Sequence, residues 1–188
     1  MSATPSLIAL LEGPSDVAAV RAIMRRNEIG GDHVELRNLQ GVTNIGRVLP
    51  EIRQLQPDAD VVGMCDAAEV RFVERALVAD GCPVSDASDL PAYGFFVCEA
   101  DLEDELIRAL GTSRAVEAIQ SAGLGGKLEA LQIQPAWADR PLAEQLHRFC
   151  GVASGRKEQV AGVLAAELSR DELPEPLSML VDRIAWSA

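Results

Sequence analysis

Apolar and polar positions along the first hundred residues alternate between short apolar runs and segments with helical spacing. Four strands are predicted by the runs at Leu7–Glu12, Val34–Leu39, Asp60–Cys65 and Tyr93–Cys98. Three helices are predicted between them, at Ser15–Asn27, Asn44–Leu55 and Ala67–Asp80. Strands that alternate with helices of this length are typical of βαβ units. We therefore expect an α/β fold with a mostly parallel four-stranded sheet flanked by helices.

The pattern changes after Leu102, where only helical spacing remains. Helices are predicted at Leu102–Leu110, Ser113–Ala122, Leu142–Cys150, Ser154–Leu168 and Leu177–Trp186, with Gly- or Pro-rich breaks between them. One of these breaks is GLGGK at 123–127, which we expect to be flexible. The chain thus divides into an α/β core over residues 1–111 and a helical extension over 112–188, packed on that core.

Composition limits the class of protein. Hydrophobic residues make up 48% of the 188 positions, which is enough for a substantial core. The longest apolar runs fall short of the ~18 residues that a membrane span needs, so no membrane association is expected. The four cysteines form no CxxC motif and no Cys/His cluster. These features indicate a reduced, cytoplasmic protein without zinc.

The net charge of −12 restricts how the chain could bind nucleic acid. Binding by charge alone requires a basic surface that neutralises phosphates, and here 29 acidic residues stand against 17 lysines and arginines. Either the chain binds no nucleic acid, or divalent cations or a basic partner supply the missing positive charge.

Acidic residues follow three of the four predicted strands. The first strand ends in Glu12, the third runs into Asp66, and the fourth is followed by Glu99 and Asp101. Further acids come within the first helical turn after these strands, at Asp16, Glu69, Glu103 and Asp104. Ligands of parallel α/β sheets bind at the carboxyl ends of the strands. Oxygen-only clusters suit Mg²⁺ or Mn²⁺, and two such ions can clamp a phosphodiester.

A purely structural role is open for several of these acids. Acidic residues are common at helix N-termini, where they accept hydrogen bonds from free N–H groups. Asp101 with Asp104 could be an ordinary capping pair, and Asp16 an ordinary first-turn acid. Glu12 is different, because it ends an apolar strand just before a glycine, where capping is not its obvious role.

Several segments resemble the Toprim fold, the catalytic domain of topoisomerases, bacterial primases and overcoming-lysogenization-defect (OLD) family nucleases. LLEGPSD resembles its glutamate motif, and VVGMCDAAE resembles its second motif, a strand that ends in Asp. GFFVCEADLEDELIRALG and ASGRKEQVAGVLAAEL resemble the Toprim half of OLD nucleases more specifically. The resemblance covers essentially the whole chain and implies a Toprim-like Rossmannoid fold.

The resemblance also implies roles for particular residues in a two-metal nuclease. Glu12 would be a metal ligand or general base, Asp66 the shared ligand, and Asp16 a ligand of the second ion. Glu103 with Asp101 would complete the metal ligands. Lys157 would stabilise charge on the scissile phosphate, with Arg156 beside it. A solvated first turn of a helix is an equally good interpretation of this basic pair.

Two departures from the family pattern affect the functional prediction. The usual Asp-x-Asp of the second motif is here Asp66–Ala67–Ala68, and Glu69 either substitutes for the missing acid or leaves one metal site weakened. No GxxxxGK[ST] motif occurs, although OLD nucleases carry an ATPase. The chain would then act without ATP or with a separately encoded ATPase, and a homodimer is left open.

The leading hypothesis is therefore a Mg²⁺- or Mn²⁺-dependent enzyme that hydrolyses DNA phosphodiester bonds and meets DNA through its metal ions. The alternative is a catalytically weakened Toprim domain that serves as a nucleic-acid- or partner-binding regulatory subunit. A third hypothesis is another Toprim chemistry, such as nucleotidyl transfer or RNA cleavage. For His33 and His147, the only histidines, we expect surface or packing roles.

Overall fold

The computed structural model describes residues 5–151 and 155–186, and it has the α/β architecture that the sequence predicts. Four strands form one parallel sheet in the order β2-β1-β3-β4. The strands are β1 (Leu7–Leu11), β2 (Val34–Asn38), β3 (Asp60–Asp66) and β4 (Phe95–Cys98). The central pair, β1 and β3, is nearly fully buried, as their continuous apolar sequences require.

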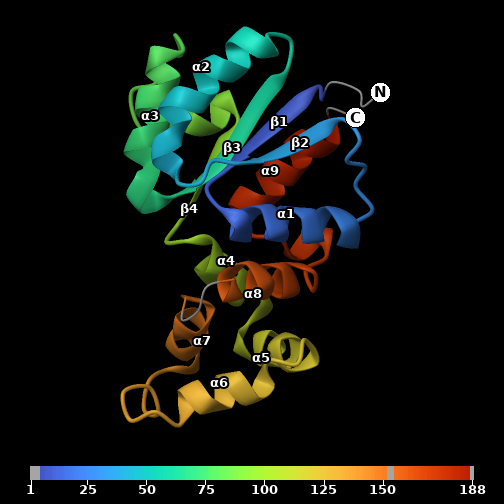
Figure 1. Cartoon of the computed structure of the whole chain (residues 1–188), viewed down its shortest axis with the longest axis vertical. Coiled ribbons are helices and arrows are strands. Elements are labelled where there is room, and N and C mark those ends of the chain that lie inside the picture. Colours follow the sequence, from blue (N-terminus) through green and yellow to red (C-terminus); the bar gives the residue numbers. More distant parts are fainter. Residues whose placement is uncertain (1–4, 152–154, 187–188) are drawn as a thin grey trace.

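Helices cover both faces of the sheet (Figure 1). One face is covered by α2 (Ile45–Leu55) and α3 (Val70–Ala79), and the other by α1 (Pro14–Arg26), α8 (Arg156–Ala165) and α9 (Glu175–Trp186). The strand residues alternate between the two cores, with Ala9 and Leu11 facing the α1 side and Ile8 and Leu10 the α2 side. This period of two is what a strand buried on both faces produces.

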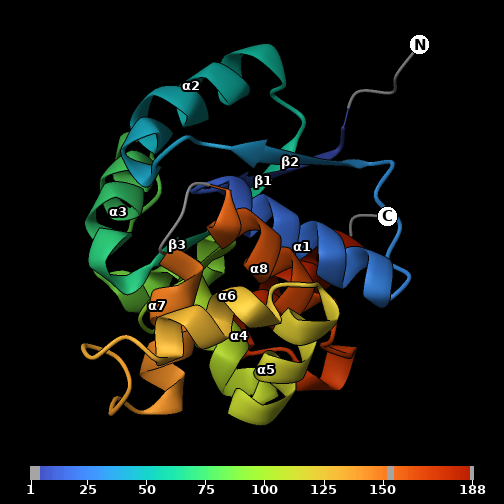
Figure 2. The same cartoon turned by 60° about the horizontal axis from the view of Figure 1, so that its bottom comes forward.

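The remaining helices lie beyond the carboxyl ends of the strands, at the bottom of Figure 1. They are α4 (Leu102–Leu110), α5 (Thr112–Ser121), α6 (Gly125–Gln132) and α7 (Leu142–Gly151). Figure 2 shows α8 lying against α1, which places a helix of the second half directly on the core of the first. Apolar residues from both halves form one hydrophobic cluster, so the helical extension shares its core with the α/β unit. The boundary at residue 111 stays a prediction.

Two local features differ from the sequence predictions. The GLGGK segment is not a break throughout, because α6 begins at Gly125. Burial of Leu128 and Leu131 stabilises this helix despite the low helix propensity of two glycines. The fourth strand begins at Phe95 rather than Tyr93, because a 3₁₀ segment (Ala87–Tyr93) precedes it. The predicted start of the helix at Ser154 lies outside the described residues.

Among the described residues, no helix is long and apolar enough to cross a membrane.

Candidate metal centre

The strand order creates a crevice at the carboxyl ends of β1 and β3. After β1 the chain passes to β2 on one side of β1, and later returns to β3 on its other side. The helices that leave these two strand ends, α1 after β1 and α3 after β3, lie on opposite faces of the sheet. Such a point, where the connections diverge to opposite faces, is the usual ligand site of parallel sheets. Glu12 and Asp66 are the acids that stand at this point.

The backbone around Glu12 is held by the loop that follows β2. The N–H of Leu39 donates to the carbonyl of Leu11 at 2.8 Å, and the N–H of Gly41 donates to the carbonyl of Glu12 at 2.9 Å. Gly41 has a φ of 106°, a conformation that residues with a Cβ atom rarely adopt. A glycine is therefore needed to bring this loop against Glu12, and the loop fixes the backbone of that residue.

The side chain of Glu69 lies close to that of Asp66 because a short 3₁₀ turn follows β3. The turn spans Ala67–Glu69, and a 3₁₀ turn has about three residues, so residues 66 and 69 fall on the same side. Carboxylate oxygens of Glu12, Asp66 and Glu69 all lie within 4.8 Å of one another. Ala67 and Ala68 are exposed and contribute no ligand oxygen. Glu69 thus lies beside Asp66, and its replacement of the missing aspartate stays a prediction.

Burial and neighbouring carboxylates raise the pKa values of Glu12 and Asp66. Burial, a hydrogen bond with Glu69 and repulsion by that residue raise the pKa of Glu12 from 4.5 to about 7. Burial, together with repulsion by Glu12 and other acids, raises the pKa of Asp66 from 3.8 to about 7. The positive charge of Lys157 opposes both shifts but does not cancel them. The cluster therefore carries more negative charge than the protein neutralises.

Asp16 lies near this cluster but already has partners. It is buried at the start of α1, where its Oδ2 accepts hydrogen bonds from the N–H of Gly13 at 3.1 Å and from the hydroxyl of Ser15 at 3.3 Å. Burial raises its pKa, and repulsion by Glu12 adds to this shift. The first-turn role considered from the sequence is confirmed in geometry, although Asp16 stays close enough to Glu12 to repel it.

Glu103 and Lys157 form an ion pair beside the cluster. Lys157 Nζ lies 3.1 Å from Oε2 of Glu103, whose side chain is only 2% exposed. Oε1 of Glu103 is buried without a hydrogen-bond partner in the described structure. Burial raises the pKa of Glu103, and Lys157 opposes this shift. Burial alone would lower the pKa of Lys157, but Glu103, Asp16 and Asp66 outweigh it, so the ammonium is firmly charged.

Asp101 is held by two partners. Its Oδ1 accepts from the N–H of Asp104 at 2.9 Å and so caps α4, and its Oδ2 lies 2.6 Å from Nε2 of His147. Although burial works in the opposite direction, these hydrogen bonds lower the pKa of Asp101. The capping pair considered from the sequence is present. The contact with His147 was missed, because no local pattern links residues so far apart in the chain.

Two other residues considered from the sequence have partners outside the cluster. The guanidinium of Arg156 lies over the ring of Phe149, 4.6 Å from its centroid. The carboxylate of Glu99 pairs with Arg108. A role for Arg156 at a phosphate stays a prediction, and Glu99 belongs to a different surface from the other strand-end acids.

The donor set fits a hard divalent cation. Glu12, Asp66 and Glu69 offer only oxygen, from three carboxylates that already lie together. Oε2 of Glu69 and Oε1 of Glu103 are buried without hydrogen-bond partners, which is costly unless a ligand uses them. The raised pKa values of Glu12 and Asp66 show the same lack of positive charge. Mg²⁺ or Mn²⁺ would supply that charge.

Known structures match the fold over its whole length. The C-terminal region of the Burkholderia pseudomallei OLD protein aligns with a TM-score of 0.65 and 21% identity, over 99% of this chain and 100% of that one. The C-terminal region of the Xanthomonas campestris pv. campestris OLD protein aligns with a TM-score of 0.67 and 22% identity, over 97% and 96%. This chain has the fold of the OLD C-terminal region.

The likeness to OLD C-terminal regions includes the sheet and the helices that follow it, since it covers almost all of both chains. The Toprim-like fold that the sequence motifs indicated is therefore confirmed. No protein-family model and no curated protein sequence matches the chain. The function must accordingly be derived from the residues that this chain places at its site.

Proposed function

We propose that this chain is a Mg²⁺- or Mn²⁺-dependent, nuclease-like Toprim domain that hydrolyses DNA phosphodiester bonds. The observation that carries the proposal is the convergence of Glu12, Asp66 and Glu69 at the divergence point of the sheet. The likeness to OLD C-terminal regions supports it. Bound divalent ions would also allow a chain of net charge −12 to approach a DNA backbone.

Each residue contributes a separate part of this chemistry. A bound divalent ion would polarise the phosphate and activate water as the attacking group. Glu12, Asp66 and Glu69 would hold that ion, and any protons on Glu12 and Asp66 would be released to solvent when it binds. Lys157 would offset negative charge on the phosphate, because it is charged and lies beside the acids. Glu103 holds the ammonium in that place.

A second ion would compete with protein partners. Asp16, the acid expected for it, and the further acids Asp101 and Glu103 are engaged with Gly13, His147 and Lys157. The two-metal mechanism therefore needs Asp16 or Asp101 to exchange a protein partner for an ion, or needs the ion to bind Oε1 of Glu103, which has no hydrogen-bond partner in the described structure. The same observation favours the second candidate function, a weakened Toprim domain that binds one ion and acts as a regulatory subunit. A separately encoded ATPase and a homodimer stay predictions.

The proposal is tested by cleavage of supercoiled plasmid DNA with Mg²⁺ or Mn²⁺. Glu12→Ala and Asp66→Ala should each abolish metal-stimulated nicking, whereas Glu51→Ala, which removes an exposed carboxylate of α2, should leave it unchanged. Circular dichroism should show that all three variants are folded. Unchanged nicking in both cluster variants would remove the nuclease assignment.

Titration calorimetry with Mn²⁺ separates the two candidate functions. The nuclease proposal expects two ions per chain in the presence of a DNA oligonucleotide, because the phosphate supplies ligands for the second. The regulatory alternative expects at most one weakly bound ion, with or without DNA, and no cleavage. If no Mn²⁺ binds at all, the nuclease proposal fails.

A further inference from the structure

The sheet has an open edge at β4, on the side of β3 that faces away from β1. Strand β4 pairs with β3 on one side, and no further strand follows it in the sheet that the structure describes. The N–H of Gly63 donates to the carbonyl of Gly94. In a parallel ladder, the backbone N–H and C=O of every second residue point to the same neighbouring strand. Because Gly94 bonds to β3, Phe96 and Cys98 also face β3, and the backbone groups of Phe95 and Val97 face outward. An unpaired edge is a template for another strand.

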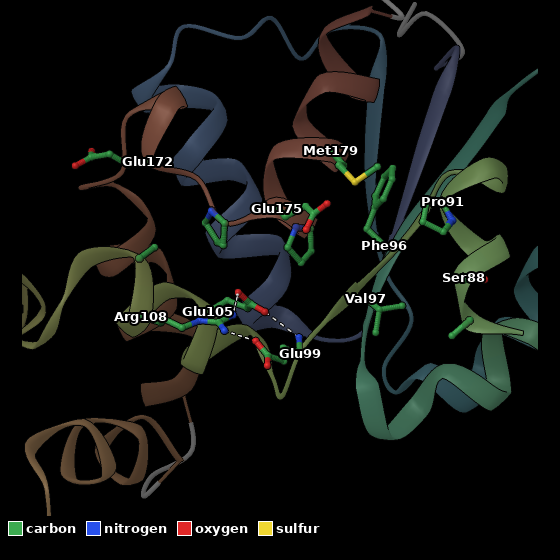
Figure 3. Close-up of a pocket in the computed structure, with 14 residues that line it drawn as sticks. Ser88, Pro91, Phe96, Val97, Glu99, Glu105, Arg108, Glu172, Glu175 and Met179 are labelled. Atoms are coloured by element: carbon green, nitrogen blue, oxygen red, sulfur yellow. Dashed lines mark hydrogen bonds and ion pairs between the residues drawn. The ribbon is translucent and has the colours of Figure 1, made fainter.

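A cavity of about 780 Å³ lies along this edge (Figure 3). Its walls come from three separate elements, with Pro91 on the 3₁₀ segment, Arg108 on α4 and Met179 on α9. Phe96 and Val97 of β4 lie between them. A second cavity, of about 380 Å³, shares Pro91, Phe96 and Met179 with it. The two form one groove that follows the strand edge.

The groove ends in an exposed aromatic side chain. Trp186 lines the second cavity and is 87% exposed. Large aromatic residues in this position are costly to leave in water, and they commonly anchor a bound partner. With the outward backbone of Val97 and the apolar surface of Met179, the groove offers hydrogen bonds and apolar contact together. These are the two components of recognition by strand addition.

The charge of the groove indicates the partner, and its second cavity adds one residue of each sign, Asp182 and Arg183. The charged residues that line the main cavity are four glutamates and one arginine, namely Glu99, Glu105, Glu172, Glu175 and Arg108. Arg108 is already neutralised by Glu99 and Glu105, and Glu172 is paired with Arg114. Glu175 is exposed at the start of α9. A nucleic-acid backbone would be repelled here, and a second copy would bring like charges together.

We propose that this groove binds an extended, lysine- or arginine-rich peptide segment of another protein, which adds to β4 as a fifth strand. The peptide backbone would pair with the outward groups of Val97. Its apolar side chains would face Met179 and Trp186, and its basic side chains would meet Glu99 and Glu175. This interaction does not involve the metal centre.

The probe is a fluorescein-labelled peptide of alternating lysine and valine, followed by fluorescence anisotropy. The peptide should bind, and a glutamate–valine peptide of equal length should not. Glu175→Lys should weaken binding about tenfold, because a rim attraction becomes a repulsion. Glu144→Lys, the same change in the first turn of α7 and outside the groove, should alter it by less than about twofold. Equal binding of both peptides, or no effect of Glu175→Lys, would overturn the proposal.

Hydrogen exchange of the Val97 amide provides the second readout. Peptide binding should slow exchange at Val97 about tenfold and leave Asp58, in the turn before β3, unchanged. An unaffected Val97 amide would exclude strand addition. Displacement of the peptide by double-stranded DNA, or a dimer that already protects Val97 without peptide, would assign the groove to a different occupant. Glu12→Ala should bind the peptide normally, so failure of the nuclease proposal would not affect this result.

Discussion

Lys157 Nζ lies 3.1 Å from Oε2 of Glu103, and this ion pair joins the first turn of α8 to the first turn of α4. The same ammonium lowers the pKa of Glu12 and Asp66 against the effect of burial. One lysine from the C-terminal helices therefore neutralises part of an acidic site built by the sheet. The helical extension over residues 112–188 therefore contributes a charge to the site.

Lys157→Met should reduce both stability and cleavage. Without the ammonium, Glu103 is left as a buried carboxylate without a counter-charge, which costs about 2 kcal/mol after allowance for the half-exposed lysine. Urea denaturation measures this loss.

The double variant Lys157→Met with Glu103→Gln separates structure from chemistry. It removes both charges and should recover most of the stability, while cleavage should stay low because no cation meets the phosphate. If cleavage returned together with stability, Lys157 would have only a structural role.

Glu69→Ala should weaken Mn²⁺ binding at least about tenfold, since it removes one of three clustered carboxylates, and even outer-shell partners commonly contribute that much. Calorimetry measures the affinity. Glu74→Ala, on the helix α3 that follows Glu69 and outside the cluster, is the matched control. Equal affinities in the two variants would show that Glu69 does not replace the missing aspartate of the motif.

Without metal, the protein should be more stable at pH 5 than at pH 8. The pKa values of Glu12 and Asp66 are about 7 in the folded chain, against 4.5 and 3.8 for free side chains. Between pH 4 and pH 7 the folded chain therefore holds protons that the unfolded chain has released. Stability is lost as pH rises through this window, by on the order of 2 kcal/mol once solvent screening is allowed for.

Urea denaturation in EDTA at the two pH values measures this difference. Glu12→Gln with Asp66→Asn should reduce it, because amides carry no titrating charge, and saturating Mg²⁺ should raise stability most at pH 8. A metal-free protein that gains stability as pH rises would contradict the electrostatic account of the cluster.

Asp101→Asn should distinguish a helix cap from a metal ligand. Asparagine caps helices about as well as aspartate, so stability should change by less than about 0.5 kcal/mol, whereas Asp101→Ala should cost about 1 kcal/mol. Because Asp101 already pairs with His147, we expect Asp101→Asn to leave the affinity for the first Mn²⁺ ion unchanged. A large loss of affinity would make Asp101 a ligand.

Much of the fold could be predicted from the sequence, because its signals are local. The apolar runs at Leu7–Leu11 and Asp60–Asp66 are buried on both faces. They can therefore be recognised as strands without knowledge of the neighbouring strands. The helix α6 was missed for the opposite reason. Its glycines disfavour a helix, and only the burial of Leu128 and Leu131 in the assembled core stabilises one.

The sequence alone determined that acids would gather at the carboxyl edge of the sheet, because strand ends and charge can be read from neighbouring residues. Only the tertiary structure decided which of them pair with basic side chains. Glu103, Asp101 and Glu99 are taken by Lys157, His147 and Arg108, whereas Glu12, Asp66 and Glu69 are left facing one another. The physical reason is that charge pairing depends on distances in space, and most of these partners come from helices distant in the chain.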